Sequence, residues 1–297
     1  MKTVNAIKTG LLRSVKAWKG VLIAWLFYSL FVVVLAIPLR SSIRSGFGNS
    51  MITERFADGF NLEAFSDLEN VGRSLISSLS SGLLLALVIG IILNAFLSGG
   101  LFASLKDKAG RLTPSGFFAA SGKYFLKFLF ITFILSIIAL LLGFFIIFTP
   151  AGLVMQSEPD LEKLSLIIGI VSGFLYFIIL SIIVLVADYA RAWNVGREQP
   201  LCFRAIGFGI KRTFERFRSS FMVVLFIMLV QGILTFLVYE FIGMWRPDSG
   251  WGVFLLFMIS QLFFIMRLLI KTWRYGAVTN LMELIDKSSQ EEKTINL

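Results

Sequence analysis

Six long stretches of this chain are apolar and almost free of charge, and they constrain its fold more than any other feature. A helix needs roughly 17–25 apolar residues to cross the hydrocarbon core of a bilayer. The stretches that meet this length are residues 21–37, 83–102, 128–148, 164–187, 221–239 and 251–270. Only the last contains a charged residue, Arg267. They lack the alternation of polar and apolar residues that barrel strands show, so we predict an all-α, polytopic membrane protein with six transmembrane helices.

The composition excludes a water-soluble globule. Hydrophobic residues make up 57% of the chain, charged residues make up 15%, and the mean hydropathy is +0.84. Average soluble domains are about 45–50% apolar and about 25% charged. Histidine is absent and Cys202 is the single cysteine, which excludes Ser-His-Asp triads, His-ligated metals and an internal disulfide. The common nucleotide-binding and hydrolase motifs are absent too, so no catalytic residue, metal or cofactor is expected.

The lysines and arginines predict that both termini are cytoplasmic. Positively charged flanks of membrane spans stay on the cytoplasmic side. With the N-terminus inside, all but six of the 28 basic residues fall on that side. The exceptions are Arg40, Arg44, Arg55, Arg73, Lys163 and Arg246. The net charge of +10 is therefore a signal of topology, and nucleic acid is not an expected partner.

Basic, half-apolar segments precede the first, third and fifth spans. Residues 1–19 place apolar side chains at helical spacing and basic ones on other faces, which is typical of an amphipathic helix in the membrane interface. We expect similar interfacial helices over residues 115–127 and 202–218. Basic residues near the surface attract anionic headgroups by about 1 kcal/mol each. The candidate headgroup-binding residues are Lys16, Lys19, Arg111, Lys123, Arg197, Arg204, Lys211 and Arg212. The alternative is the ordinary charge bias of cytoplasmic span ends.

The second and third of these segments match at an offset of 86 residues. The matches are Gly110-Arg111 with Gly196-Arg197, Pro114 with Pro200, Phe117 with Phe203, Ala119 with Ala205 and Phe128 with Phe214. We interpret the chain as three parallel helical hairpins, each an interfacial helix, a span, an outer loop and a second span. The alternative is that any chain of alternating topology places basic segments before its odd-numbered spans.

Two regions lie outside this pattern. Residues 39–82 form the long outer loop, which is acidic at its centre and ends in a predicted helix leading into the second span. Residues 285–297 form a polar tail that we expect to be frayed. The chain is otherwise one membrane domain over residues 1–297.

Two sets of polar residues inside or beside the spans are candidate sites. Asp188 and Arg191 share a helix face at the inner end of the fourth span, with Arg267 as a candidate partner at the same depth. They form either a gate or an ion pair that fixes helix depth, and we favour the ion pair. Asn94, Gln231 and Gln261 lie within spans and either line a pathway or form interhelical hydrogen bonds worth about 0.6 kcal/mol each.

The six-span layout, the segment Ala187-Asp188-Tyr189-Ala190-Arg191-Ala192 and the Gly-Phe-Phe segment at 116–118 resemble a group of bacterial membrane proteins. These are similar to the membrane domain found beside glycerophosphodiester phosphodiesterases. The sequence contains no counterpart of the soluble phosphodiesterase barrel, so the resemblance implies neither hydrolase activity nor site residues. It implies a multi-pass module of the bacterial inner membrane with a lipid-related role.

Three classes of function are compatible with these features. A non-catalytic protein that binds anionic lipid or partner membrane proteins through its basic cytoplasmic face is favoured, because nothing in the sequence demands chemistry. A transporter component for a small or lipid-like solute is the first alternative, since internal repeats are common in transporters. An intramembrane lipid-modifying enzyme is the second, and it would rely on Asp, Glu, Lys or Tyr for acid–base work.

Overall fold

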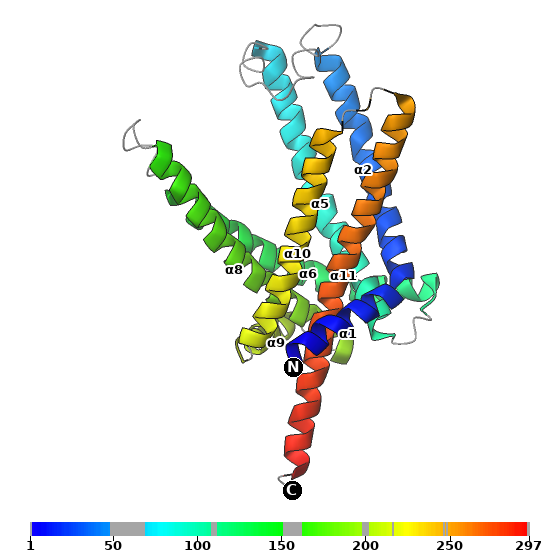
Figure 1. The fold of residues 1–297 in the computed structure, drawn as a ribbon, viewed down its shortest axis with the longest axis vertical. Coiled ribbons are helices and arrows are strands. Elements are labelled where there is room, and N and C mark those ends of the chain that lie inside the picture. Colours follow the sequence, from blue (N-terminus) through cyan, green and yellow to red (C-terminus); the bar gives the residue numbers. More distant parts are fainter. Residues whose placement is uncertain are drawn as a thin grey trace. The chain divides into compact units, whose positions relative to one another are not determined.

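The computed structural model describes residues 2–47, 69–107, 112–150, 162–197, 202–215, 217–245, 247 and 249–295. These residues form helices and no strand. The helices are α1 (Lys2–Lys16), α2 (Trp18–Phe47), α5 (Glu69–Lys106), α6 (Pro114–Gly143) with the π-helix η1 (Phe144–Phe148), α8 (Glu162–Arg197), α9 (Cys202–Glu215), α10 (Phe217–Met244) and α11 (Gly250–Ile295), shown in Figure 1.

Six of these helices are long and apolar enough to cross a membrane, which confirms the predicted multi-pass helical fold. The spans are Trp18–Pro38, Gly82–Lys106, Pro114–Phe148, Ile167–Gly196, Phe217–Met244 and Gly250–Leu284. Between 11% and 28% of each apolar window is buried inside the protein. Most of the apolar surface therefore needs hydrocarbon as its solvent.

The chain divides into two compact units. One comprises Ala24–Asn94, in which α2 and α5 are the described helices. Within it, Tyr28 Oη donates a hydrogen bond to Asn94 Oδ1 at 3.3 Å, so this mid-span amide takes part in an interhelical contact. The other unit comprises Met1–Ile23 and Ala95–Leu297, and it contains α1, α6 and the helices from α8 to α11.

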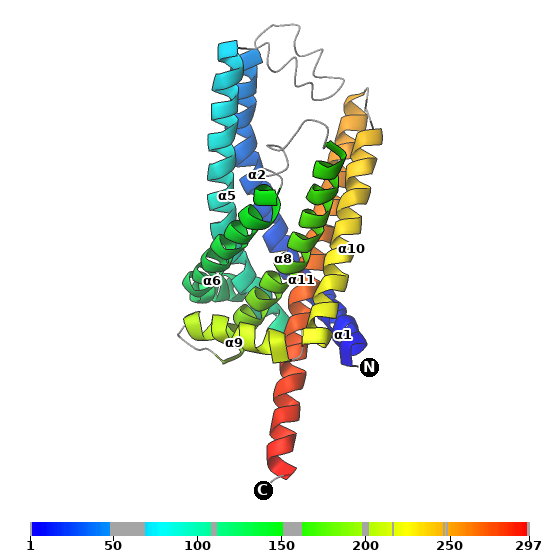
Figure 2. The ribbon, with the colours of Figure 1, turned by 90° about the vertical axis from the view of Figure 1, so that its left-hand side faces the viewer.

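Two of the three expected interfacial helices are separate elements. α1 and α9 are short helices that lie just before the spans α2 and α10 in the sequence, and Figure 2 shows α9 lying across the end of α8. The prediction was wrong for residues 115–127, which are the first turns of α6 and continue into its span without a break. The start of α6 is well defined, since Thr113 Oγ1 accepts a hydrogen bond from the Gly116 amide at 3.2 Å and Pro114 occupies the first turn.

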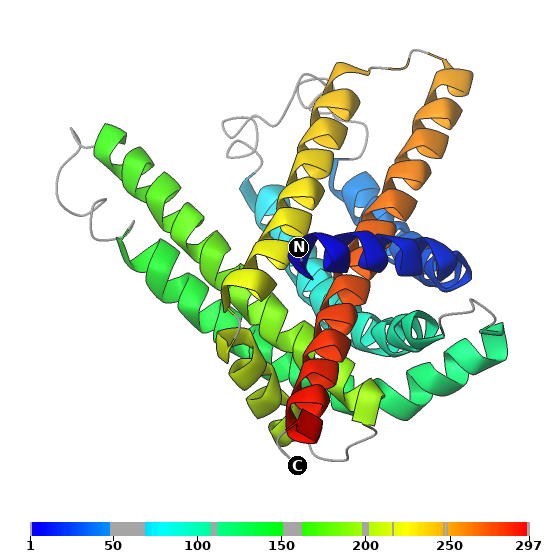
Figure 3. The same ribbon diagram turned by 60° about the horizontal axis from the view of Figure 1, so that its bottom comes forward.

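Small residues let α1 and α9 approach the spans closely. The buried face of α1 carries Ala6, Gly10 and Ser14, and that of α9 carries Ala205, Gly209 and Thr213, at the same four-residue spacing. α1 packs on α11, where it crosses that helix in Figure 3, and α9 packs on α8. A Cβ atom at position 10 would lie 2.6 Å from the Ala277 nitrogen, and one at position 209 would lie 2.5 Å from the Val186 oxygen. Only glycine fits at these two crossings.

The beginning of α6 makes a comparable contact with α5. A Cβ at Gly99 would lie 3.1 Å from the Ser121 Cα, and one at Gly100 would meet the Phe117 ring at 2.5 Å. Each of the three basic segments therefore packs on the end of a span that does not directly follow it. We call the end of the spans at which α1 and α9 lie the basic end.

Contacts between the two termini secure the basic end. Arg13 in α1 forms an ion pair with Glu283 in α11, with 2.7 Å between Nη2 and Oε2. Its Nη1 also donates to Glu283 Oε1 at 3.0 Å. Trp273 Nε1 donates to the Ile7 carbonyl at 2.8 Å. These bonds join residues about as far apart in sequence as the chain allows.

The predicted loop and tail are shorter than expected. Helices α2 and α5 extend into the flanks of the 39–82 loop, and residues 48–68 lie outside the described part of the chain. The tail is not frayed over residues 285–295, because α11 continues through them to Ile295. This segment is rich in Glu, Gln and Lys, which have high helix propensity and extend a helix that is already nucleated.

Candidate functional site

A buried cluster of charges lies where α6, α8 and α11 meet at the basic end. The Asp188 side chain is 0% exposed and lies between two arginines. Arg191 Nη1 donates to Asp188 Oδ1 at 3.2 Å, and Arg274 Nε donates to Asp188 Oδ2 at 2.7 Å. Arg191 Nη2 also donates to Thr132 Oγ1 at 2.9 Å. One carboxylate therefore serves two guanidinium groups, and these three residues carry a net positive charge.

The structure corrects the candidate third member of this ion cluster. Arg267 is exposed, and the second arginine on Asp188 is Arg274. Arg267 and Arg274 lie seven residues apart on α11, about 10 Å along the helix at 1.5 Å per residue. The expectation failed because it ended the sixth span at residue 270, whereas α11 continues as a helix past Arg274 to Ile295. Asp188 therefore lies beside a point on α11 that is seven residues nearer the C-terminus than expected.

Aromatic residues surround the ion cluster. Tyr189 Oη and Ser220 Oγ lie 2.7 Å apart and link α8 to α10. The Tyr275 ring stacks on Phe102, with 4.5 Å between the ring centroids. Tyr189 and Tyr275, which directly follow Asp188 and Arg274 in the sequence, are both fully buried.

Sequence reasoning missed Arg274, although a signal for it was present. Asp188 and Arg274 are 86 residues apart, which is the offset at which the basic segments match. At the same offset Tyr189 matches Tyr275 and Asn194 matches Asn280. Two residues of α8 and α11 that are separated by this offset therefore form the ion pair.

A groove of about 540 Å³ runs beside this cluster. Phe177 of α8 forms one wall, Arg274 of α11 lines it as well, and the remaining lining residues come from α10. Those residues are Met228, Gln231, Gly232, Thr235, Phe236 and Tyr239. Figure 1 shows α8 and α10 diverging from their basic ends, and the groove lies between them. Gln231 is thus the one predicted mid-span polar residue that lines it.

The predicted headgroup-binding residues occupy several helices of the basic end. Lys16, Lys19, Lys123, Arg204 and Lys211 are exposed. Arg212 is half-buried and bonds Glu215 through Nη1 at 2.8 Å, and Lys211 Nζ lies 3.8 Å from the same carboxyl group. Arg111 and the side chain of Arg197 lie outside the described part of the structure.

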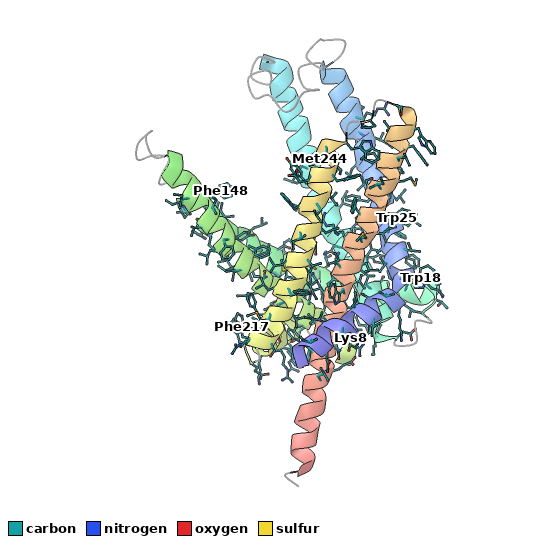
Figure 4. All side chains as sticks on the ribbon, in the orientation of Figure 1. Lys8, Trp18, Trp25, Phe148, Phe217 and Met244 are labelled. Carbon is teal, nitrogen blue, oxygen red and sulfur yellow. The ribbon has the colours of Figure 1, made fainter. Side chains whose placement is uncertain are left out.

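Helices α1 and α9 expose apolar residues beside these cations. On α9 the exposed apolar residues are Phe203, Ile210 and Phe214, and they form one stripe at helical spacing. On α1 they include Val4, Leu11 and Val15, and the exposed Trp18 follows at the start of α2. Figure 4 labels Trp18 and Lys8, which mark the apolar and the basic residues at this part of the chain. Both helices therefore carry three sets of side chains: small ones that are buried against a span, apolar ones that are exposed, and basic ones that are exposed.

Neither metal chemistry nor known proteins identify the site. Among the described residues, no group of three or more Cys, Asp or Glu side chains could hold a metal ion. Gln261 is half-buried in α11 and is not among the residues that line the groove. No family model, curated protein or solved structure matches this chain.

Proposed function

We propose that this chain is a non-catalytic membrane protein that binds anionic lipid through its basic end, which faces the cytoplasm of a bacterial inner membrane. The observation that carries the proposal is the pair of helices α1 and α9, each docked by small residues and each exposing apolar residues beside cations. Such helices place their apolar face at the acyl boundary and their cations at the headgroups. The similarity to the membrane domain beside glycerophosphodiester phosphodiesterases stays a proposal that rests on segments 187–192 and 116–118.

Neutralising the exposed cations of α9 is expected to reduce the preference for anionic lipid. Removal of two charges worth about 1 kcal/mol each predicts a decrease of roughly tenfold or more in enrichment. The measurement is native mass spectrometry of the protein released from nanodiscs of equal phosphatidylglycerol and phosphatidylcholine, comparing Arg204→Gln/Lys211→Gln with wild type. The exposed Arg40 of α2 supplies a control, and Arg40→Gln should leave the ratio unchanged. An unchanged ratio in the double variant contradicts the proposal.

The orientation can be tested with the single native cysteine. Cys202 begins α9 and is half-buried. We expect a membrane-impermeant maleimide to label it in inverted vesicles and not in intact spheroplasts. In a Cys202→Ser background, Ser249→Cys places a thiol at the exposed turn before α11 and should show the reverse pattern. Labelling of Cys202 in spheroplasts would overturn a cytoplasmic basic end.

The groove supports a second candidate, movement of a lipid-like solute. Gln231 and Thr235 lie along a lipid-facing groove that also reaches Arg274. Polar residues on such a path would ease the passage of a headgroup through the bilayer. In proteoliposomes, accelerated transfer of a fluorescent phosphatidylglycerol between leaflets supports this candidate, and a rate equal to that of empty liposomes opposes it.

A further inference from the structure

We propose that the groove between α8 and α10 holds one acyl chain of an anionic phospholipid whose phosphate binds Arg274. The inference deepens the proposed lipid binding, on which it rests, by assigning a discrete site and the residues that select its ligand. It differs from the surface of α1 and α9, because here a single lipid is held along the helices.

The length of the groove matches one leaflet. The six α10 residues that line it begin at Met228 and recur at helical spacing to Tyr239, so they form one face over three turns. Eleven residues correspond to about 16 Å at 1.5 Å per residue. This is about half of a hydrocarbon core roughly 30 Å thick.

The lining of the groove suits an acyl chain. Phe177, Met228 and Phe236 supply apolar surface, and Gly232 leaves the face open between them. The Thr235 hydroxyl donates to the Gln231 carbonyl of its own helix at 2.9 Å, so this donor is satisfied within α10. The groove volume of about 540 Å³ leaves room for a slender chain along this face of α10.

The charge and depth of Arg274 suit a phosphate. Arg274 lies 24 residues beyond Gly250, about 36 Å along α11, which places it at headgroup level if the helix starts at the opposite interface. Arg274 bonds Asp188 through Nε, and its guanidinium also carries the two Nη atoms of the planar fork that arginine uses for bidentate phosphate binding. Because Asp188 also pairs with Arg191, the excess positive charge favours an anionic headgroup.

Filling the groove is the direct test. A Cβ at Gly232 would meet no atom within 4 Å, so Gly232→Leu projects into the groove without displacing the protein. Gly243 lies on the same helix, is equally open and is not a lining residue, which makes Gly243→Leu the matched control. The probes are dioleoyl phosphatidylglycerol and dioleoyl phosphatidylcholine, which share acyl chains and differ in charge. The readout is retention of one lipid per chain by native mass spectrometry in detergent.

We expect wild type and Gly243→Leu to retain one phosphatidylglycerol, and Gly232→Leu to lose that retention by at least tenfold. Arg274→Lys keeps a charge beside Asp188 but lacks the bidentate fork, so its preference for phosphatidylglycerol over phosphatidylcholine should fall about tenfold. Equal retention by Gly232→Leu and wild type overturns the groove site, as does a dimer that dissociates in Gly232→Leu. Arg204→Gln/Lys211→Gln should keep the single bound lipid while losing bulk enrichment, which separates this site from the surface of α9.

Discussion

Replacing Asp188 with asparagine is expected to destabilise the folded protein by about 3–5 kcal/mol, the cost of removing one partner from a buried ion pair. The carboxylate is fully buried and is bonded by Arg191 and by Arg274. Without it, two guanidinium groups stay buried with no countercharge. Loss of this carboxylate should lower the midpoint of thermal unfolding in detergent by roughly 10 °C.

Two further variants separate charge from packing at this cluster. The control is Asp107→Asn, which changes a half-buried carboxylate at the end of α5. It should change the free energy of unfolding by no more than about 1 kcal/mol. Replacing the whole cluster with apolar residues, Asp188→Leu/Arg191→Met/Arg274→Met, removes the uncompensated charge, so it should be more stable than Asp188→Asn. If the triple variant unfolds at a lower temperature than Asp188→Asn, the loss of stability in Asp188→Asn does not come from unpaired charge.

Adding a side chain at Gly209 is expected to displace α9 from α8. A Cβ there would lie 2.5 Å from the Val186 oxygen and 3.3 Å from the Ala190 nitrogen, and helix backbones cannot move aside as a flexible side chain can. Overpacking of this kind costs about 1–3 kcal/mol or more. Gly209→Leu should therefore raise the maleimide reaction rate of Cys202, which lies on the same helix, several-fold.

The same helix supplies the control for this prediction. Gly207 is exposed, and a Cβ there would meet nothing within 4 Å. Gly207→Leu should leave both the Cys202 reaction rate and the unfolding temperature close to wild type. Similar reaction rates in the two leucine variants would show that α9 does not depend on close approach at Gly209.

Much of the architecture could be predicted because one physical requirement dominates it. A helix that crosses hydrocarbon must hide its backbone polar groups and present about 20 apolar residues, and both demands are visible in a single segment. The six spans were located on that basis, and each predicted stretch lies almost entirely within a span of the structure. The Asp188–Arg191 spacing was informative for the same reason, since residues three apart on a helix are neighbours whatever surrounds them.

The contacts between segments could not be predicted in this way. Arg267 and Arg274 lie on nearly the same face of α11, so periodicity does not decide which of them meets Asp188. That choice depends on the relative depth of α8 and α11, which their packing sets. The groove beside Arg274 is equally invisible in the sequence, because it exists only where α8 and α10 diverge.

The sequence by itself determined the class of this protein: six helical spans, basic segments before alternate spans, and no histidine for catalysis or metal binding. The tertiary structure decided that the first turns of α6 continue into its span, that Ala6, Gly10 and Ser14 dock α1, and that Asp188 serves two arginines. The difference has one cause. Burial in lipid is a property of each segment alone, whereas a partner is defined by two segments and the distance between them.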